Sequence, residues 1–197
     1  MRKKSHISVA KFLIDNMNVN SLHNHKLSFL LGSILPDCMP SFLTRKHTIE
    51  ETFYILKKEI RNLTEEYDAE KGEGVYFCRH LGIITHYVAD YFTLPHNKIF
   101  SGSLKDHISY EKKLKFELKS YIHNDNLELS RDKNSSMKTV DDICAFIMKM
   151  HQIYIKVANE IKEDCQYIIE LCHYVVDAIF QFIEFQREKH LYAVLQH

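Results

Sequence analysis

Polar positions interrupt the longest apolar stretch of the chain, residues 167–185, at helical spacing. The interruptions follow one another at intervals of 3, 4, 4 and 3 residues and are Glu170, His173, Asp177, Gln181 and Glu184. Because such intervals place polar side chains in one stripe along a helix, the stretch predicts a mostly buried helix and not a membrane span. A looser apolar face at Ile7, Ala10, Phe12 and Ile14 predicts another helix near the start of the chain.

Local start and stop signals mark further helices. Ser5 is suited to cap the first helix, and Thr48 with Glu51 has the pattern of a capping box. Pro36 and a Gly-containing turn at residues 71–74 indicate two of the ends. The expected helical segments cover residues 6–17, 26–35, 48–67, 75–92, 104–122, 140–162 and 165–190.

Composition favours the same fold class. The chain has 197 residues, 45% of them apolar, which suffices for one sizeable core and predicts a single domain over residues 1–197. Only 5 Gly and 3 Pro are present, too few for the frequent turns of a sandwich or barrel. We therefore expect an all-α, multi-helix bundle with a polar surface linker at residues 123–136 and no internal repeat.

Charge and cysteine content narrow the classes of function. The 26 basic and 26 acidic residues balance, so only a local basic patch, and no overall field, can attract nucleic acid or anionic lipid. The five cysteines are odd in number, lack a CxxC motif and predict reduced thiols: Cys38, Cys78, Cys144, Cys165 and Cys172. The first 20 residues contain no apolar run long enough for a signal peptide. These features predict a cytoplasmic protein, and they carry no information on its oligomeric state.

Histidines paired with carboxylates at helical spacing are the candidate chemical residues. His86 and Asp90 lie four residues apart, so they share one face of an expected helix. His96 follows them, and His107 with Glu111 repeats the four-residue spacing. Either pair alone is more typical of an ordinary surface ion pair than of a site. Imidazole nitrogen and carboxylate oxygen together nevertheless suit zinc, and sites with three protein ligands leave a position for water.

Three upstream residues extend this set to eight in chain order. The full set is His6, Asp37, His47, His86, Asp90, His96, His107 and Glu111. It resembles the metal-ligand set of zinc-dependent phospholipase C, most strongly in the blocks H-x3-D-x5-H and H-x3-E. The resemblance covers about residues 5–115 and implies a trimetal cluster within a helical bundle.

The resemblance also implies how the ligands divide among two to three zinc ions. The first ion would be held by Asp37, His47, His86 and Asp90. The second ion would be held by His96, His107 and Glu111. His6 would contribute to a third site, with Asp90 as a bridge. Secreted family members also use the amino group and carbonyl of an N-terminal Trp at that site. This chain has no Trp, and its Met1 lies five residues before His6, so the resemblance supplies no such ligand here.

The function implied by the resemblance is a zinc-dependent phosphodiesterase that hydrolyses a phospholipid-like phosphate ester with metal-activated water. Asp37 would be the catalytic carboxylate, orienting or deprotonating that water as well as binding metal. The expected substrate is a phospholipid or a small phosphate ester. One alternative is a single-strand nuclease of the same fold, which the balanced charge disfavours. The other is a non-catalytic helical protein with structural zinc.

Motifs of several other enzyme classes are missing from the sequence. It contains no phosphate-binding glycine loop and no nucleophile elbow. An HD-type phosphohydrolase needs an adjacent His-Asp pair, whereas Asp106 and His107 occur in the reverse order. A ferritin-like di-iron bundle needs two Glu-x-x-His motifs, and only Glu170 to His173 fits.

A few other residues have both a functional and an ordinary interpretation, and the ordinary one is favoured. Arg79 lies almost two turns before His86 and could contact a phosphate oxygen, but a solvent-facing arginine is more common. Tyr87 and Tyr91 could surround a choline-like cation, although aromatic residues at helical spacing normally belong to a core. The remaining candidates are the His23 and His25 pair, which is weak, and His173 with Asp177, interpreted as a surface ion pair.

Overall fold

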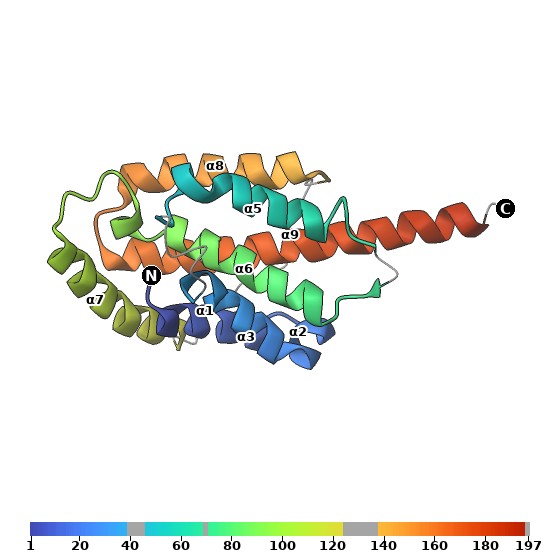
Figure 1. Cartoon of the computed structure of the whole chain (residues 1–197), viewed down its shortest axis with the longest axis horizontal. Coiled ribbons are helices and arrows are strands. Elements are labelled where there is room, and N and C mark those ends of the chain that lie inside the picture. The colour runs from blue at the N-terminus through green and yellow to red at the C-terminus, as the bar shows by residue number, and fades with distance from the viewer. Residues whose placement is uncertain (39–45, 69–70, 124–137, 196–197) are drawn as a thin grey trace.

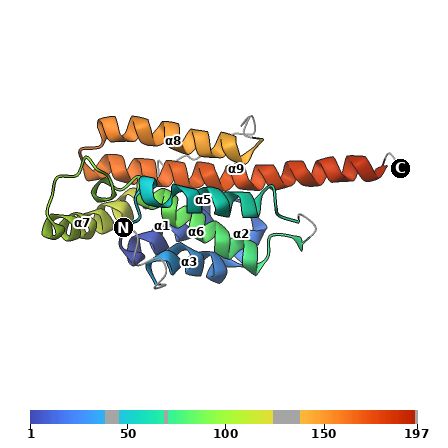
Figure 2. The same cartoon turned by 45° about the horizontal axis from the view of Figure 1, so that its top comes forward.

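The computed structural model describes residues 1–38, 46–68, 71–123 and 138–195 of the chain. This part contains eight α-helices, two 3-10 helices and no strand, so the all-α prediction is confirmed. In chain order the elements are α1 (Lys3–Asn16), α2 (Asn20–Asn24), α3 (Lys26–Ile34), η1 (Leu35–Asp37), α5 (Ile49–Leu63), α6 (Val75–Tyr91), η3 (Leu94–His96), α7 (Leu104–Ile122), α8 (Val140–Val157) and α9 (Ile161–Leu195). The C-terminal part of α9 projects beyond the other helices (Figures 1 and 2).

Helix α6 lies at the centre of the bundle, with α3, α5 and α9 packed against it (Figure 1). Thirteen of its 17 residues are buried, as expected for a helix that is covered on several sides. Two of those buried residues are the imidazole of His86 and the carboxylate of Asp90. Burial of such groups is costly unless they are paired or bound to a metal, so their position in α6 points to a function.

Two glycines set the distance between α3 and α6. A Cβ atom on Gly32 would overlap the carbonyl oxygen of Arg79, and one on Gly82 would overlap that of Phe29. Residues without a side chain therefore allow the two backbones to approach closely. The approach places the carbonyl group of Ser33 in α3 against the face of α6 that carries the ionisable residues.

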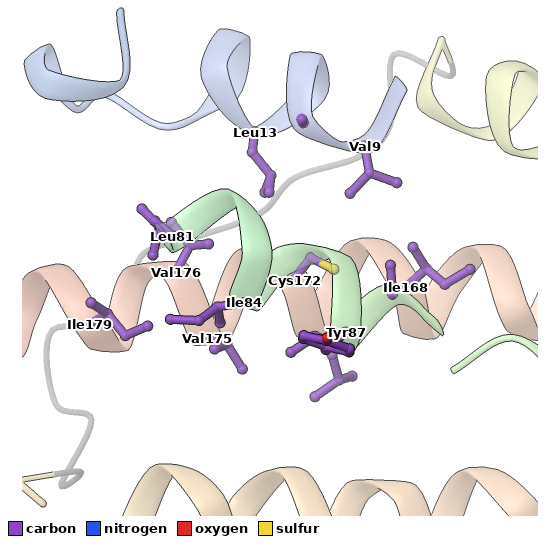
Figure 3. Packing of buried hydrophobic residues seen from close by; sticks show 14 of the residues in the cluster. Val9, Leu13, Leu81, Ile84, Tyr87, Ile168, Cys172, Val175, Val176 and Ile179 are labelled. Carbon is purple, nitrogen blue, oxygen red and sulfur yellow. The ribbon is translucent and has the colours of Figure 1, made fainter. Parts of the chain in front are cut away.

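Apolar side chains from α1, α6 and α9 meet in the core (Figure 3). Each is at most 1% exposed, and together they are Val9 and Leu13 of α1, Leu81, Ile84 and Tyr87 of α6, and Ile168, Cys172, Val175, Val176 and Ile179 of α9. Full burial of a large apolar side chain contributes about 1.5–3 kcal/mol, so this contact is a main source of stability. It also fixes the relative positions of α1 and α6, which carry His6 and His86.

Several expected helix boundaries agree with the structure. Helix α7 begins and ends at the expected residues, 104 and 122. Thr48 caps α5 as expected by accepting a hydrogen bond from the backbone N–H of Glu51. The Glu51 side chain instead accepts from the N–H of Lys46, so only half of the expected capping box forms. Gly72 adopts a positive φ of 66°, which agrees with the expected turn.

Other boundaries were predicted wrongly. Ser5 does not cap the first helix, because α1 already begins at Lys3 and Ser5 is buried within it. The polar stretch after α1 contains the short helix α2, α5 ends at Leu63, and α8 and α9 meet between Val157 and Ile161. In each case tertiary packing outweighs weak local signals. The expected linker falls almost entirely on residues 124–137, which lie outside the described residues, as does the loop at 39–45.

Two expectations concern α9. Among the described residues, no helix combines the length and the apolar character needed to cross a membrane. The His173 and Asp177 pair is not on the surface as predicted, because these side chains are only 7% and 4% exposed. Asp177 accepts a hydrogen bond of 2.7 Å from Gln181 Nε2. A four-residue spacing occurs equally on buried and exposed helix faces, so the sequence did not reveal this burial.

Candidate metal centre

The eight side chains predicted as metal ligands lie close to one another in the structure. The C-terminal end of α6, which carries two of them, lies near the N-terminus of the chain (Figure 1). They come from six segments: His6 from α1, Asp37 from η1, His47 from the residues before α5, His86 and Asp90 from α6, His96 from η3, and His107 and Glu111 from α7. Residues up to 105 positions apart in sequence therefore share one site. The structure brings all eight together.

Asp90 lies at the centre of this cluster and is fully buried. Its Oδ2 atom is 3.0 Å from His47 Nδ1 and 3.1 Å from His86 Nε2. Its Oδ1 atom is 3.4 Å from His6 Nε2 and 3.8 Å from His96 Nδ1. Because the two oxygens face different histidines, the carboxylate has the geometry of a group that bridges neighbouring cations.

A first group of ligand atoms surrounds Oδ2 of Asp90. Ligand atoms of His47, His86 and Asp90 all lie within 4.8 Å of one another. Asp37 Oδ1 lies 3.8 Å from His47 Nδ1 and 3.9 Å from His86 Nε2. These are the four residues that the resemblance assigns to one ion. Ligand atoms of Asp37 and His86 also lie within 4.8 Å of one of His6.

A second group lies between η3 and α7. Glu111 Oε1 is 3.5 Å from His96 Nε2 and 3.2 Å from His107 Nε2. The two α7 residues are one turn apart, and the helix is anchored just before them by a capping box between Ser103 and Asp106. The cap fixes where α7 begins, which in turn sets the direction of His107 and Glu111.

Backbone carbonyl groups orient two of the histidine rings. His86 Nδ1 lies 2.9 Å from the carbonyl oxygen of Ser33, and His96 Nδ1 lies 3.3 Å from that of His47. A carbonyl oxygen only accepts hydrogen bonds, so Nδ1 is the protonated nitrogen in both rings. The Nε2 lone pairs then point into the cluster. This is the outer support that metal-binding histidines typically have.

Mutual contacts set the protonation states of the cluster. Burial would raise the pKa of Asp90, but the Met1 ammonium and three histidines hold it well below its usual value. Burial likewise opposes ionisation of Glu111, yet a hydrogen bond from a histidine and the Met1 ammonium lower its pKa to about 2. Burial, together with a neighbouring histidine, lowers the pKa of His6 to about 3. At neutral pH these carboxylates are charged and His6 is neutral, which are the states that bind a cation.

The amino group of Met1 is part of the cluster, which the sequence did not predict. Its nitrogen lies 2.6 Å from Asp90 Oδ1, 2.7 Å from His96 Nε2 and 3.3 Å from Glu111 Oε1. The five-residue separation from His6 had suggested a position outside the site. Helix α1 begins already at Lys3, so the chain is wound between these residues and the amine reaches the carboxylates.

The environment of His6 tests whether a metal would fit. Its Nε2 atom is buried and forms no hydrogen bond with any described residue. Nevertheless, it faces Asp90 at 3.4 Å and Asp37 at 4.0 Å, and its ring stacks on that of His86 with centroids 3.9 Å apart. Buried polar atoms normally have a partner, and a cation between this nitrogen and the carboxylates would supply one. The donor set of imidazole nitrogens and carboxylate oxygens suits zinc.

The other sequence candidates lie outside the ligand set. Arg79 forms no hydrogen bond or ion pair with the cluster within the described part of the chain, and its backbone packs against Gly32. Tyr87 and Tyr91 are fully buried in the core, which leaves no room for a choline cage between them. His23 and His25 lie in and after the short helix α2. The ordinary interpretation of these residues agrees with the structure.

The fold and the site together define a helical protein with a multi-histidine, multi-carboxylate centre. A family model described as zinc dependent phospholipase C matches residues 5–161, a range that includes all eight candidate ligands. The chain belongs to the zinc-dependent phospholipase C family. The match ends at the first residue of α9. Searches of curated proteins and of solved structures return no match to this chain.

Proposed function

We propose that this protein is a phosphodiesterase that hydrolyses a phospholipid and releases the phosphorylated head group. Membership of the zinc-dependent phospholipase C family supports this class of reaction. The convergence of eight potential ligands from six segments gives independent support, since a chance surface ion pair does not recruit buried residues from across a fold.

In this proposal the ligands are divided among the zinc ions as the resemblance implies. Asp37, His47, His86 and Asp90 would hold one zinc ion, and His96, His107 and Glu111 would hold another. His6 would bind a third, with Asp90 shared between sites. When bound, zinc supplies Lewis-acid activation of water and neutralises charge on the phosphate oxygens.

Asp37 is the proposed catalytic carboxylate, and the exposure of its side chain to solvent is the observation that supports this role. Asp90 is fully buried and has four partners within 3.4 Å. The side chain of Asp37 is 21% exposed, and its three histidine neighbours lie 3.8 to 4.0 Å away. Asp37 is therefore the carboxylate of the first group that can contact both water and substrate. Its carboxylate accepts the proton of the attacking water.

The bonds in the proposed reaction balance without a further reactant. The water oxygen forms a bond to phosphorus while the phosphorus–oxygen bond to diacylglycerol breaks. One water proton passes to Asp37, which then passes it to the departing diacylglycerol oxygen, while the other water proton stays on the phosphate, so the products are diacylglycerol and a phosphomonoester. Asp90 keeps its negative charge during this exchange, because the Met1 ammonium and the neighbouring histidines hold its pKa well below the usual range.

The proposed compartment is the cytoplasm. All five cysteines carry free thiols, and four of them are buried. Free thiols persist in reducing surroundings, which supports this location.

The test measures turnover by zinc-loaded protein of phosphatidylcholine in micelles, a chromogenic phosphocholine ester and single-stranded DNA. We expect phosphocholine release from the lipid, and a loss of kcat of at least about a hundredfold in Asp37→Asn. Asp141→Asn is the control, because Asp141 is exposed and pairs only with Lys57 in the described residues. Cleavage of DNA with no turnover of either choline ester would favour the nuclease alternative. No turnover of any substrate by fully metallated protein would favour a non-catalytic zinc protein.

A further inference from the structure

Helix α7 presents a basic and apolar surface next to the candidate metal centre. Successive residues of an α-helix are rotated by about 100°, so along residues 104–119 of α7 seven exposed or half-exposed residues share a sector of about 120°. We call this sector the α7 outer face, and it consists of Leu104, Lys105, Ile108, Lys112, Lys115, Phe116 and Lys119. It contains four lysines, three large apolar side chains and no acidic residue.

Within the described part of the chain, the apolar residues of this face remain largely uncovered. Leu104 is 76% exposed, Ile108 is 42% exposed and Phe116 is 64% exposed. Lys115 Nζ lies over the Phe116 ring, 4.1 Å from its centroid, so cationic and aromatic groups point in the same direction. The opposite side of the helix is buried through Leu114 and Leu118. Single apolar residues on a surface are common, but three along one basic helix face form a surface suited to binding.

The α7 outer face borders the candidate metal centre directly. Leu104 precedes His107 by three residues, and Ile108 precedes Glu111 by three, so two of the three exposed apolar side chains neighbour a proposed ligand on the helix. His107 is 31% exposed, the most exposed ligand in its group. A surface bound to this face would therefore lie beside the open edge of the site.

Charge and polarity decide what fits this face. The formal net charge of the chain is zero, so the positive charge of this face is local. Asp106 and Glu117 lie on the opposite side of α7, and Glu111, at the border of the face, belongs to the candidate metal centre. A second copy would set lysines against lysines, and a nucleic acid would leave the apolar side chains uncovered. An anionic bilayer satisfies both features, because lysines reach head-group phosphates while apolar tips enter the acyl boundary. Lys3 and Lys4 are exposed at the start of α1, which packs against α7 and adds positive charge nearby.

We propose that the α7 outer face docks on the surface of an anionic phospholipid bilayer and thereby presents lipid head groups to the metal centre. Docking itself requires no catalysis, so only the presentation of lipid head groups to the metal centre rests on the proposed function. Such docking depends on both charge and apolar contact, so it weakens with salt and with loss of either component.

Binding to vesicles tests the docking surface. Zinc-loaded Asp37→Asn protein, which leaves the lipid intact, is sedimented with vesicles of phosphatidylcholine alone or mixed equally with phosphatidylglycerol. The double variant Lys105→Gln/Lys112→Gln, in the same background, should bind the anionic vesicles roughly 30-fold more weakly. The matched control is Lys149→Gln/Lys156→Gln, two exposed lysines that are also seven residues apart but lie on α8. This control should bind as the parent does. Leu104→Ser/Phe116→Ser should also weaken binding while the free energy of unfolding stays within about 0.5 kcal/mol.

Several results would overturn the inference. One is an absence of binding to anionic vesicles. Another is an equal loss of vesicle affinity in the α7 and α8 lysine variants. The third is a concentration-dependent dimer that the α7 lysine variant abolishes. Turnover of a short-chain, monomeric phosphatidylcholine by wild-type protein separates this proposal from the proposed function. Turnover without vesicle binding contradicts the docking surface alone. Vesicle binding through α7 without turnover contradicts the hydrolase and leaves the docking surface standing.

Discussion

The carboxylate of Asp164, in the first turn of α9, accepts a hydrogen bond of 2.8 Å from the backbone N–H of Leu94, the first residue of η3. The same carboxylate accepts hydrogen bonds from the hydroxyl groups of Tyr110 at 3.0 Å and Tyr154 at 2.6 Å. It thereby joins α7, α8, α9 and the 3-10 turn that carries His96. Asp164 is fully buried, so these contacts hold one side of the candidate site in place from the core.

Substitution of Asp164 should distinguish its hydrogen bonds from its charge. Asp164→Ala leaves three donors without their acceptor and should lower the free energy of unfolding by about 3 kcal/mol. Asp164→Asn keeps one oxygen as an acceptor and gains an N–H donor, for which a tyrosine oxygen can act as the acceptor. At low pH it should therefore lower the free energy of unfolding less than Asp164→Ala does. Urea unfolding of both variants at pH 4 measures the difference. Equal losses in the two variants would show that the hydrogen bonds do not account for the effect.

The pH dependence of the Asp164→Asn effect has a definite sign. Burial raises the pKa of Asp164 to about 6, although the tyrosine and backbone hydrogen bonds oppose the change. The folded state then binds a proton more tightly than the unfolded state. The resulting stabilisation is full below the ordinary pKa of 3.8 and is lost as the pH rises through 6. Between pH 4 and pH 7 the stability of the variant relative to wild type should therefore rise by about 3 kcal/mol. A constant difference across this range would contradict the raised pKa.

Asp90 and Asp177 form a matched pair for testing metal binding. Both are buried helical aspartates with a histidine four residues earlier, but only Asp90 belongs to the ligand cluster. Asp90→Asn should lose at least one zinc ion per chain, because one oxygen of the proposed bridging carboxylate becomes an amide. Asp177→Asn should keep its full metal content, whatever its stability. Elemental analysis after dialysis against metal-free buffer gives the comparison. Similar zinc content in the two variants would contradict the assignment of Asp90.

The contact between α3 and α6 gives a prediction about packing. Gly32→Ala places a methyl group on the carbonyl oxygen of Arg79, so the two helices must separate. Such overpacking should lower the free energy of unfolding by about 3 kcal/mol. Because α3 also supplies the carbonyl of Ser33 to His86 Nδ1, zinc affinity should fall as well. Gly74→Ala is the control, since no atom lies within 4 Å of the added methyl group. Chemical unfolding and zinc titration of both variants test the prediction, and equal behaviour would refute it.

The sequence predicted the helices best where local signals agreed with packing. Helix α7 illustrates this, because Ser103 and Asp106 cap its first turn and a polar stretch of the sequence follows its last residue, and both expected bounds agree with the structure. Helix α1 shows the opposite case. Ser5 is a good local capping residue. The helix nevertheless extends back to Lys3, because burial of Val9 and Leu13 in the core stabilises α1. Local propensity is too weak to oppose that burial.

The candidate site was visible in the sequence because its ligands repeat a helical spacing. His86 with Asp90, and His107 with Glu111, could be identified without any knowledge of the fold. Other parts of the site depend on contacts between distant segments. The position of the Met1 amine and the hydrogen bond from Leu94 to Asp164 join residues at least 70 positions apart, and no local pattern signals them. His173 and Asp177 share the same spacing without joining the site, so spacing alone does not identify a ligand.

The last prediction concerns the third ion and uses His6. A ligand that binds only the folded state stabilises it by about 4 kcal/mol when its free concentration is 1,000 times its dissociation constant, so a chelator should lower the free energy of unfolding substantially. His6 is proposed to bind only the third ion, and its Nε2 atom has no hydrogen-bond partner among the described residues. His6→Gln should therefore hold one zinc ion fewer than wild type and lose less stability on chelation. His151→Gln is the control, because His151 is also buried but bonds to Asn97 at 2.7 Å, outside the cluster. It should keep the zinc content and the chelator response of wild type, even if its stability is lower. A wild-type zinc content in His6→Gln, with an unchanged response to chelator, would remove His6 from the metal centre.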